Sequence, residues 1–206
     1  NRCHPWDMRS LGIDPARLKT GAIVMAIAVA VLWLLEIIDT LSNHALDGFG
    51  IKPWDVTGLD GIAFAPLLHA GFSHLAANSV PLFVLGTALW TSGLKQWVVA
   101  TATSWVTSGI LAWLLTPLHY LVLGASGVIF GWITYLIVRG FLSRKWGHIV
   151  VALVVLLVYG SVLLGVFPAS PTVSWQGHLG GAVGGALAAW LLFRREARRN
   201  KARPVI

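Results

Sequence analysis

Charged residues are scarce in this sequence. Asp, Glu, Lys and Arg together make up 11% of its 206 residues, which is less than half the share in a typical soluble domain. Hydrophobic residues make up 56% of the chain and lie in long blocks. The shortage of charge excludes an ordinary soluble domain, and the block pattern predicts an all-α protein that crosses a membrane several times.

Cysteine and acidic residues are also few. Cys3 is the single cysteine, which excludes an internal disulfide, and we interpret its thiol as inert. Lys and Arg number 15 against 8 Asp and Glu, giving a formal charge of +7. The basic residues lie between the apolar blocks and toward the chain ends, so their excess predicts contact with anionic membrane lipid and not with nucleic acid.

Six apolar segments are long enough to cross a membrane as helices. They cover residues 21–41, 72–92, 96–116, 118–138, 147–167 and 174–193. The long connection 42–71 is rich in glycine, proline and aromatic residues, so we expect an ordered loop that partly dips into the membrane. These segments define a membrane domain over residues 21–195, with an N-terminal segment (1–20) before it and a basic tail (196–206) after it.

The distribution of Lys and Arg predicts the orientation in the membrane. With six spans, all of the 15 Lys and Arg residues except Lys52 fall on one side. Both termini are therefore expected in the cytoplasm, and the loop 42–71 outside. The compact six-span core fits a bacterial inner membrane.

Polar side chains gather at a similar depth in three of the spans, although polar groups are costly inside a membrane. Counting from the basic residue at the inner end of each span, at about 1.5 Å per residue, puts Ser126, His178, Asn78 and His74 at about 20, 24, 26 and 32 Å. The hydrocarbon core is about 30 Å thick. Three distant stretches of sequence therefore bring these groups to one layer near the outer surface.

Ser126 lies in the run Gly124-Ala125-Ser126-Gly127. Gly124 permits a tight turn, so we expect an apolar loop over 117–123 and a helix that begins at about Ser126. The backbone N–H of Ser126 would then be free to stabilise an oxyanion, while its hydroxyl acts as a nucleophile. Taken alone, the motif also fits a serine in a tightly packed helix of small residues.

His178 opens the last span, and an imidazole is the usual base for a serine nucleophile. Glycines recur four residues apart both in this span and in the one that carries Ser126, which permits close contact of the two helices. They are Gly177, Gly181 and Gly185 in one span and Gly127 and Gly131 in the other. No acidic residue lies at this depth in either span, so the sequence predicts a Ser–His pair without a carboxylate. A lone histidine bonded to a carbonyl or to water is the plainer alternative.

His74 and Asn78 are four residues apart and share one helix face. Both can donate an N–H to a developing oxyanion, and an interhelical hydrogen bond is the structural alternative. His69 is expected to hold the outer loop to the bundle. A zinc site made of His69, His74 and His178 is disfavoured, because the spacing does not suit one helix face and no HExxH motif is present. We therefore predict neither a metal nor a cofactor.

Together these motifs resemble those of the rhomboid family. His69-x4-His74-x3-Asn78, Gly124-x-Ser126-Gly127 and Gly177-His178-x-Gly180-Gly181 stand in that order within about residues 20–195. The resemblance implies a six-helix intramembrane serine endopeptidase with Ser126 as nucleophile and His178 as base. It also implies that the Ser126 N–H, His74 and Asn78 line the oxyanion hole. The substrates would be single-span membrane proteins, cut near their outer ends at small residues and admitted by a gate beside the fifth span and the loop 167–174.

Two positions depart from the family pattern. The Trp-Arg pair of the first outer loop is absent, since Trp54 precedes Asp55. A tyrosine that often lies four residues after the serine is replaced by Phe130, which can still stack on His178. Two other classes stay open: a non-catalytic rhomboid-like protein that binds membrane clients, which would usually lack the serine or histidine, and a small transporter or channel, for which no convincing internal repeat is visible.

Overall fold

The computed structural model describes residues 14–168 and 173–201, which form a helical bundle. Its α-helices are α1 (Pro15–Leu41), α2 (Gly61–Phe64), α3 (Phe72–Thr91), α4 (Leu94–Leu115), α5 (Ser126–Ser143), α6 (Trp146–Tyr159) and α7 (Trp175–Lys201). Short 3-10 helices are η2 (Ala45–Phe49), η3 (Val56–Gly58), η4 (Ala65–Leu67) and η5 (Gly160–Val166). Most of the predicted N-terminal segment, the end of the basic tail and the middle of the predicted gate loop lie outside the described residues.

Each predicted span corresponds to one long helix, with differences at the ends. The predicted span 118–138 is irregular up to Ala125 and helical only from Ser126, because Gly124 takes a left-handed φ of +114° that no helix continues through. The predicted span 147–167 leaves the α-helix after Tyr159 and ends as the tighter η5. Helices α1 and α7 both extend beyond the predicted limits of the membrane domain, toward the chain ends.

Five helical segments of the described chain are long and apolar enough to cross a membrane: α1, α3, α4, α5 and α6 together with η5. Helix α7 is not among them, because its glycines and the polar Gln176 and His178 dilute its apolar residues. The prediction of a multi-span helical protein is thus confirmed. Helix α7 has 27 residues, as many as α1, but its sequence is less apolar.

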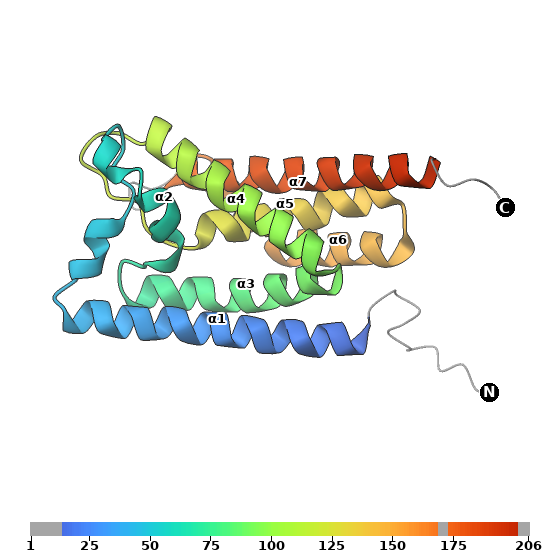
Figure 1. Cartoon of the computed structure of the whole chain (residues 1–206), viewed down its shortest axis with the longest axis horizontal. Coiled ribbons are helices and arrows are strands. Elements are labelled where there is room, and N and C mark those ends of the chain that lie inside the picture. Colours follow the sequence, from blue (N-terminus) through green and yellow to red (C-terminus); the bar gives the residue numbers. More distant parts are fainter. Residues whose placement is uncertain (1–13, 169–172, 202–206) are drawn as a thin grey trace.

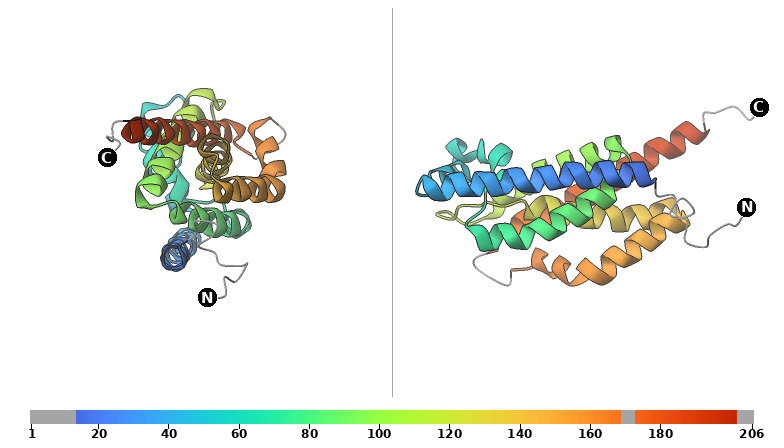
Figure 2. Two further views of the ribbon diagram at one scale, coloured as in Figure 1. Left: turned by 90° about the vertical axis from the view of Figure 1, so that its right-hand side faces the viewer. Right: turned by 90° about the horizontal axis from the view of Figure 1, so that it is seen from below.

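The long helices alternate in direction, so that α1 begins and α7 ends at the same end of the bundle (Figure 1). Seen end on, α5 runs through the middle, with α3, α4, α6 and α7 around it, and α1 packs on the outside against α3 (Figure 2). Burial follows this arrangement, since 56% of the α5 span is buried against 22% of the α1 span. The residues of α5 are therefore the most strongly fixed by their neighbours.

The long connection between α1 and α3 is ordered, as predicted, and covers one end of α4 (Figure 1). Indole N–H groups hold it there: Trp54, Trp105 and Trp113 donate to the carbonyls of Thr116, Ile62 and Asp55 at 3.2, 2.8 and 2.9 Å. Ile51 and Val122 pair through two backbone hydrogen bonds, which tie the connection to the segment before α5. Tryptophans thus anchor this loop in the absence of a Trp-Arg pair.

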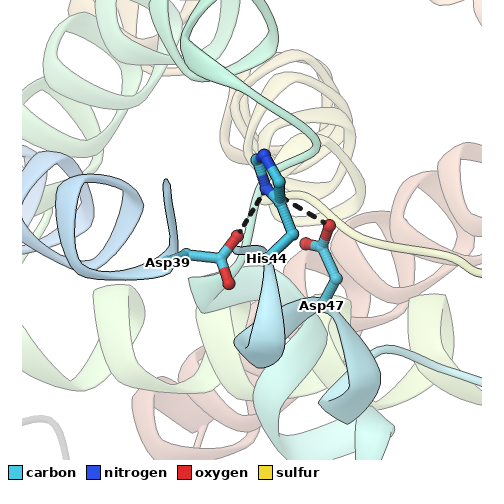
Figure 3. Close-up of side chains that lie close together, drawn as sticks. All are labelled: Asp39, His44 and Asp47. Atoms are coloured by element: carbon cyan, nitrogen blue, oxygen red, sulfur yellow. Dashed lines mark hydrogen bonds and ion pairs between the residues drawn. The ribbon is translucent and has the colours of Figure 1, made fainter. Parts of the chain in front are cut away.

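A turn fixed by Asp39 starts this connection (Figure 3). The chain leaves α1 through Asn43 and His44, which both have left-handed φ values, 55° and 61°. The buried Asp39 carboxylate accepts the Leu46 N–H at 2.7 Å and lies 3.1 Å from Nδ1 of His44. A carboxylate oxygen of Asp47 lies 3.8 Å from the same nitrogen. These contacts fold the loop back over the bundle.

Helices α5 and α7 touch backbone to backbone. A Cβ atom added to Gly181 would overlap the carbonyl oxygen of Gly127, and one added to Gly185 would overlap that of Gly131. The close approach predicted from these glycines is therefore present. Hydroxyls reinforce it, since Thr134 of α5 donates to the Ala182 carbonyl of α7 at 2.8 Å. Such contacts are typical of small-residue packing between membrane helices.

Replacing Gly181 by alanine is expected to push α5 and α7 apart. We expect the free energy of unfolding to fall by about 1–3 kcal/mol, the usual cost of overpacking, measured by SDS titration in detergent with tryptophan fluorescence. Gly48→Ala is the matched control, because a Cβ there meets nothing within 4 Å. Equal unfolding midpoints for the two variants would contradict the packing argument.

Candidate active site

The turn before α5 sets the position of Ser126. Gly124 has a φ of +114°, and its N–H donates to the carbonyl of Ala65 at 2.9 Å. A Cβ atom at Gly124 would lie 2.7 Å from Cε1 of His74, so the position excludes any side chain. Helix α5 then begins at Ser126, as the sequence predicted, and no side chain caps its first turn. The first N–H groups of the helix therefore lack intrahelical acceptors.

Ser126 and His178 lie within hydrogen-bond distance. Nε2 of His178, at the start of α7, lies 2.8 Å from Oγ of Ser126. Nδ1 of the same ring lies 3.0 Å from the carbonyl oxygen of Gly165. A carbonyl can only accept, so in the neutral ring Nδ1 carries the hydrogen and Nε2 is left to accept the Ser126 O–H. The carbonyl of Gly165 thus orients the imidazole from the side on which a catalytic triad has a carboxylate.

The imidazole of His178 also packs against the ring of Phe130. The ring of Phe130 stacks on it with centroids 4.0 Å apart and planes inclined by 12°, which is the stacking expected from the sequence. A Cβ atom at Gly165 would come within 2.9 Å of Phe130, so the carbonyl of residue 165 can reach the imidazole only because this residue is glycine. Sequence reasoning missed Gly165, although a glycine in an apolar run just before Pro168 is a signal for an interrupted helix.

His69 lies behind the Ser126 turn. Its side chain is 2% exposed, and its Nε2 accepts the N–H of Ala125 at 3.5 Å. Burial, with the nearby His74 adding to it, lowers the pKa of His69 to about 4, so the ring is neutral and can accept. His69 joins the loop before α3 to the turn before α5, and it bridges two loops directly at the candidate site.

His74 and Asn78 both lie on α3. His74 lies against the turn before α5, whereas the hydrogen bond of Asn78 stays within α3. His74 Nδ1 accepts the Ala70 N–H at 3.4 Å, which leaves the hydrogen on Nε2, the atom next to Gly124. The rings of His69 and His74 are 5.1 Å apart, edge to face. Asn78 is buried, and its amide nitrogen donates to the His74 carbonyl at 3.0 Å, within its own helix. One amide hydrogen of Asn78 stays available.

A cavity of about 480 Å³ opens beside His74. It lies between the ends of α3, α4 and α7, and its wall includes Tyr120, Leu121 and Gln176. The amide of Gln176 donates to the Leu115 carbonyl at 3.3 Å and so ties α7 to the end of α4. The volume lies within the range of ligand-binding clefts, large enough for a short stretch of extended peptide.

The three histidines His69, His74 and His178 do not form a metal-ligand group. Among the described residues, the group whose potential ligand atoms lie within 4.8 Å of one another is Asp39, His44 and Asp47, at the end of α1. The ring nitrogens of His178 are directed at Ser126 and Gly165. A hydroxyl, a neutral imidazole and free N–H donors are the groups that nucleophilic acyl transfer requires.

Comparison with known proteins identifies a Rhomboid domain over residues 57–195, more than half of the chain. An uncharacterized protein of Mycobacterium tuberculosis is 46% identical over 197 residues, which cover 90% of this chain and 81% of that protein. An uncharacterized protein of Mycobacterium leprae is 41% identical over 193 residues, covering 88% and 75% of the two chains.

Two relatives from Bacillus subtilis are named as a putative rhomboid protease and a rhomboid protease. The putative rhomboid protease YdcA is 32% identical over 135 residues, 65% of this chain and 67% of YdcA. The rhomboid protease GluP is 29% identical over 176 residues, 80% of this chain and 33% of GluP. The matched Rhomboid domain spans every helix from α3 to the start of the basic tail, together with the Ser126–His178 contact. The chain is a multi-pass integral membrane protein that belongs to the rhomboid family.

Proposed function

We propose that this protein is an intramembrane serine endopeptidase that cleaves transmembrane segments of membrane-protein substrates. The observation that carries the proposal is the 2.8 Å contact between Ser126 Oγ and His178 Nε2, with the opposite ring nitrogen bonded to a carbonyl. Two helices that are far apart in sequence supply these groups at the same level of the bundle. The names of two relatives, the putative rhomboid protease YdcA and the rhomboid protease GluP, support the same activity.

In the proposed mechanism, His178 is the general base. Nε2 takes the proton of Ser126 as Oγ attacks the carbonyl carbon of the scissile peptide bond, and a tetrahedral intermediate forms. The imidazolium then gives this proton to the leaving amine, the C–N bond breaks, and an acyl-enzyme remains. Water, deprotonated by His178, hydrolyses the ester and restores the hydroxyl. These steps require neither a metal nor a cofactor.

The oxyanion is proposed to be stabilised by three N–H donors. They are the backbone N–H of Ser126 at the uncapped start of α5, Nε2–H of His74 and the free amide hydrogen of Asn78. Donors fixed in advance by a helix start and by packed side chains lose little energy to reorganisation as charge develops.

A single-span substrate is proposed to enter from the lipid beside α6 and η5. This segment is the least buried of the candidate spans, with 11% of it covered by the rest of the structure. It also carries Gly165, whose carbonyl holds the base. Because α6 packs chiefly against α5 alone and is otherwise exposed, it can move aside at low cost, and small substrate residues would fit best near the closely packed glycines of α5 and α7.

We further propose six membrane spans, α7 being the sixth, with both termini in the cytoplasm of a bacterial cell and the site opening toward the outer face of the inner membrane. The alternating helix directions support an even number of crossings (Figure 1). The basic residues support the orientation, since Lys52 alone among the Lys and Arg residues falls on the outer side.

Removing either member of the Ser–His pair is expected to abolish cleavage. With a model single-span substrate in liposomes, Ser126→Ala and His178→Ala should each lower the initial rate by at least about 10³-fold. Ser73→Ala and His119→Ala are matched controls, because both side chains lie outside the contact network of Ser126 and should keep the wild-type rate.

Two outcomes would contradict the catalytic proposal. Equal cleavage by the wild type and the Ser126→Ala variant would place the chemistry elsewhere. Substrate that binds both proteins equally and is cut by neither would instead make the chain a client-binding member of the family.

Loss of an oxyanion donor is expected to lower kcat with little effect on KM, because the charge exists only in the transition state. His74→Leu and Asn78→Ala should each reduce kcat by about 10²-fold. His74→Gln, which restores an N–H donor, should recover part of the loss. A rise in KM at unchanged kcat would assign both side chains to substrate binding.

Two reporters test the proposed orientation, one that is active only in the cytoplasm and one that is active only outside it. A fluorescent protein fused after Ile206 should fluoresce, and alkaline phosphatase inserted after Gly48 should be active, because the first folds in the cytoplasm and the second outside it. Alkaline phosphatase activity at the C-terminal fusion would contradict an even number of spans.

A further inference from the structure

A second cavity, of about 200 Å³, lies at the opposite end of the bundle from Ser126. It is enclosed by the start of α1, the end of α3, the last turns of α5 and the first turn of α6. The proposed protease mechanism uses none of its residues. In the proposed orientation this end of the bundle lies at the cytoplasmic headgroup layer.

The wall of this cavity concentrates positive charge. Arg17 at the start of α1, Arg139 near the end of α5 and Lys145 directly before α6 all line it. No Asp or Glu of the described chain lines it with them. The one acidic contact among these cations is that of Arg17 with Asp14 at 3.9 Å, and both side chains are more than half exposed, so this pair contributes little. Three like charges around one space favour an anion within it.

The start of α6 adds a second kind of anion-binding group. Its first turn has no side-chain cap, so the N–H groups there lack intrahelical acceptors. Gly147 and His148, from that turn, line the cavity. A helix start carries about half a positive charge and is a ready phosphate site. Ser92, at the end of α3, adds a hydroxyl to the wall.

Helices α1 and α6, which both line the cavity, carry exposed apolar side chains along their length. Ile23 and Ile27 of α1 and Leu153 of α6 are about half exposed, and Trp146 at the start of α6 is 69% exposed. Indole rings favour the headgroup layer. An anion with two acyl chains could therefore place its phosphate among the cations and its chains along α1 and α6, whereas a free phosphate would use the cations alone.

We propose that this cavity binds the phosphate group of an anionic membrane lipid. The site is a headgroup site between transmembrane helices, in which two guanidinium groups, one ammonium group and the start of α6 meet the phosphate oxygens. Arginine is suited to this role because its planar fork donates two parallel hydrogen bonds to phosphate. The proposal does not depend on the Ser–His pair, so its failure would leave the protease proposal intact.

Native mass spectrometry of the full chain in neutral detergent tests the proposal, with phosphatidylglycerol as probe and phosphatidylcholine as the zwitterionic control. We expect one retained phosphatidylglycerol per chain. Arg139→Gln with Lys145→Gln should weaken its retention by about 10- to 30-fold, from the usual contribution of two basic residues near an anionic headgroup. Arg195→Gln with Arg198→Gln removes the same charge from the exposed end of α7 and should change retention less than about twofold.

Milder variants and a phosphate titration test the site and the source of the anion separately. Arg139→Lys, which keeps the charge, and the single Lys145→Gln variant should elute at the wild-type volume in size exclusion and show intermediate lipid binding. Inorganic phosphate, titrated against thermal unfolding of the lipid-free protein, identifies the source of the anion. Stabilisation by phosphate with no retained phosphatidylglycerol would overturn the lipid assignment. Equal losses in the cavity and α7 double variants, or retention of phosphatidylcholine equal to that of phosphatidylglycerol, would overturn the site itself.

Discussion

The direct backbone contact between α5 and α7 is the constraint on which the rest of this structure depends. Where Gly127 faces Gly181, a single added methyl group would overlap a carbonyl oxygen. Membrane helices gain little from apolar burial against one another, because lipid is equally apolar, so close packing and hydrogen bonds must hold them together. The glycines supply that closeness, and hydroxyls such as that of Thr134 fill the hydrogen-bonding capacity of the facing backbone.

That contact also fixes the chemistry available at the site. Ser126 begins α5 and His178 lies in the first turn of α7, so the approach of the two helices sets the 2.8 Å distance between their side chains. Each partner then receives its orientation from a nearby glycine. Gly124 turns the chain so that α5 starts at the serine, and Gly165 brings a carbonyl to the far nitrogen of the imidazole. Rigid supports of this kind hold the hydroxyl and the imidazole in place without a carboxylate.

The two ends of the bundle carry opposite electrostatic character. The end that carries Ser126 has a connection between α1 and α3 in which Lys52 is the single Lys or Arg against Asp47, Asp55 and Asp60. The other end collects Arg17, Arg139 and Lys145 around a small cavity. In our proposals, one distribution of charge thus serves both the orientation of the chain and the attachment of an anionic lipid, because both depend on attraction to the same headgroup layer.

The sequence alone determined the helical membrane class, the start of α5 at Ser126, the glycine faces of α5 and α7 and the family, because periodicity, composition and short motifs express local preferences. It also led to Phe130 as the partner that stacks on His178. Only the tertiary structure decided which groups complete the site. Gly165 lay hidden in an apolar run, His69 proved to bond to the turn before Ser126, and Asn78 bonds within its own helix. Those contacts depend on distances between segments far apart in the chain, which are set by packing and leave no local pattern in the residues that make them.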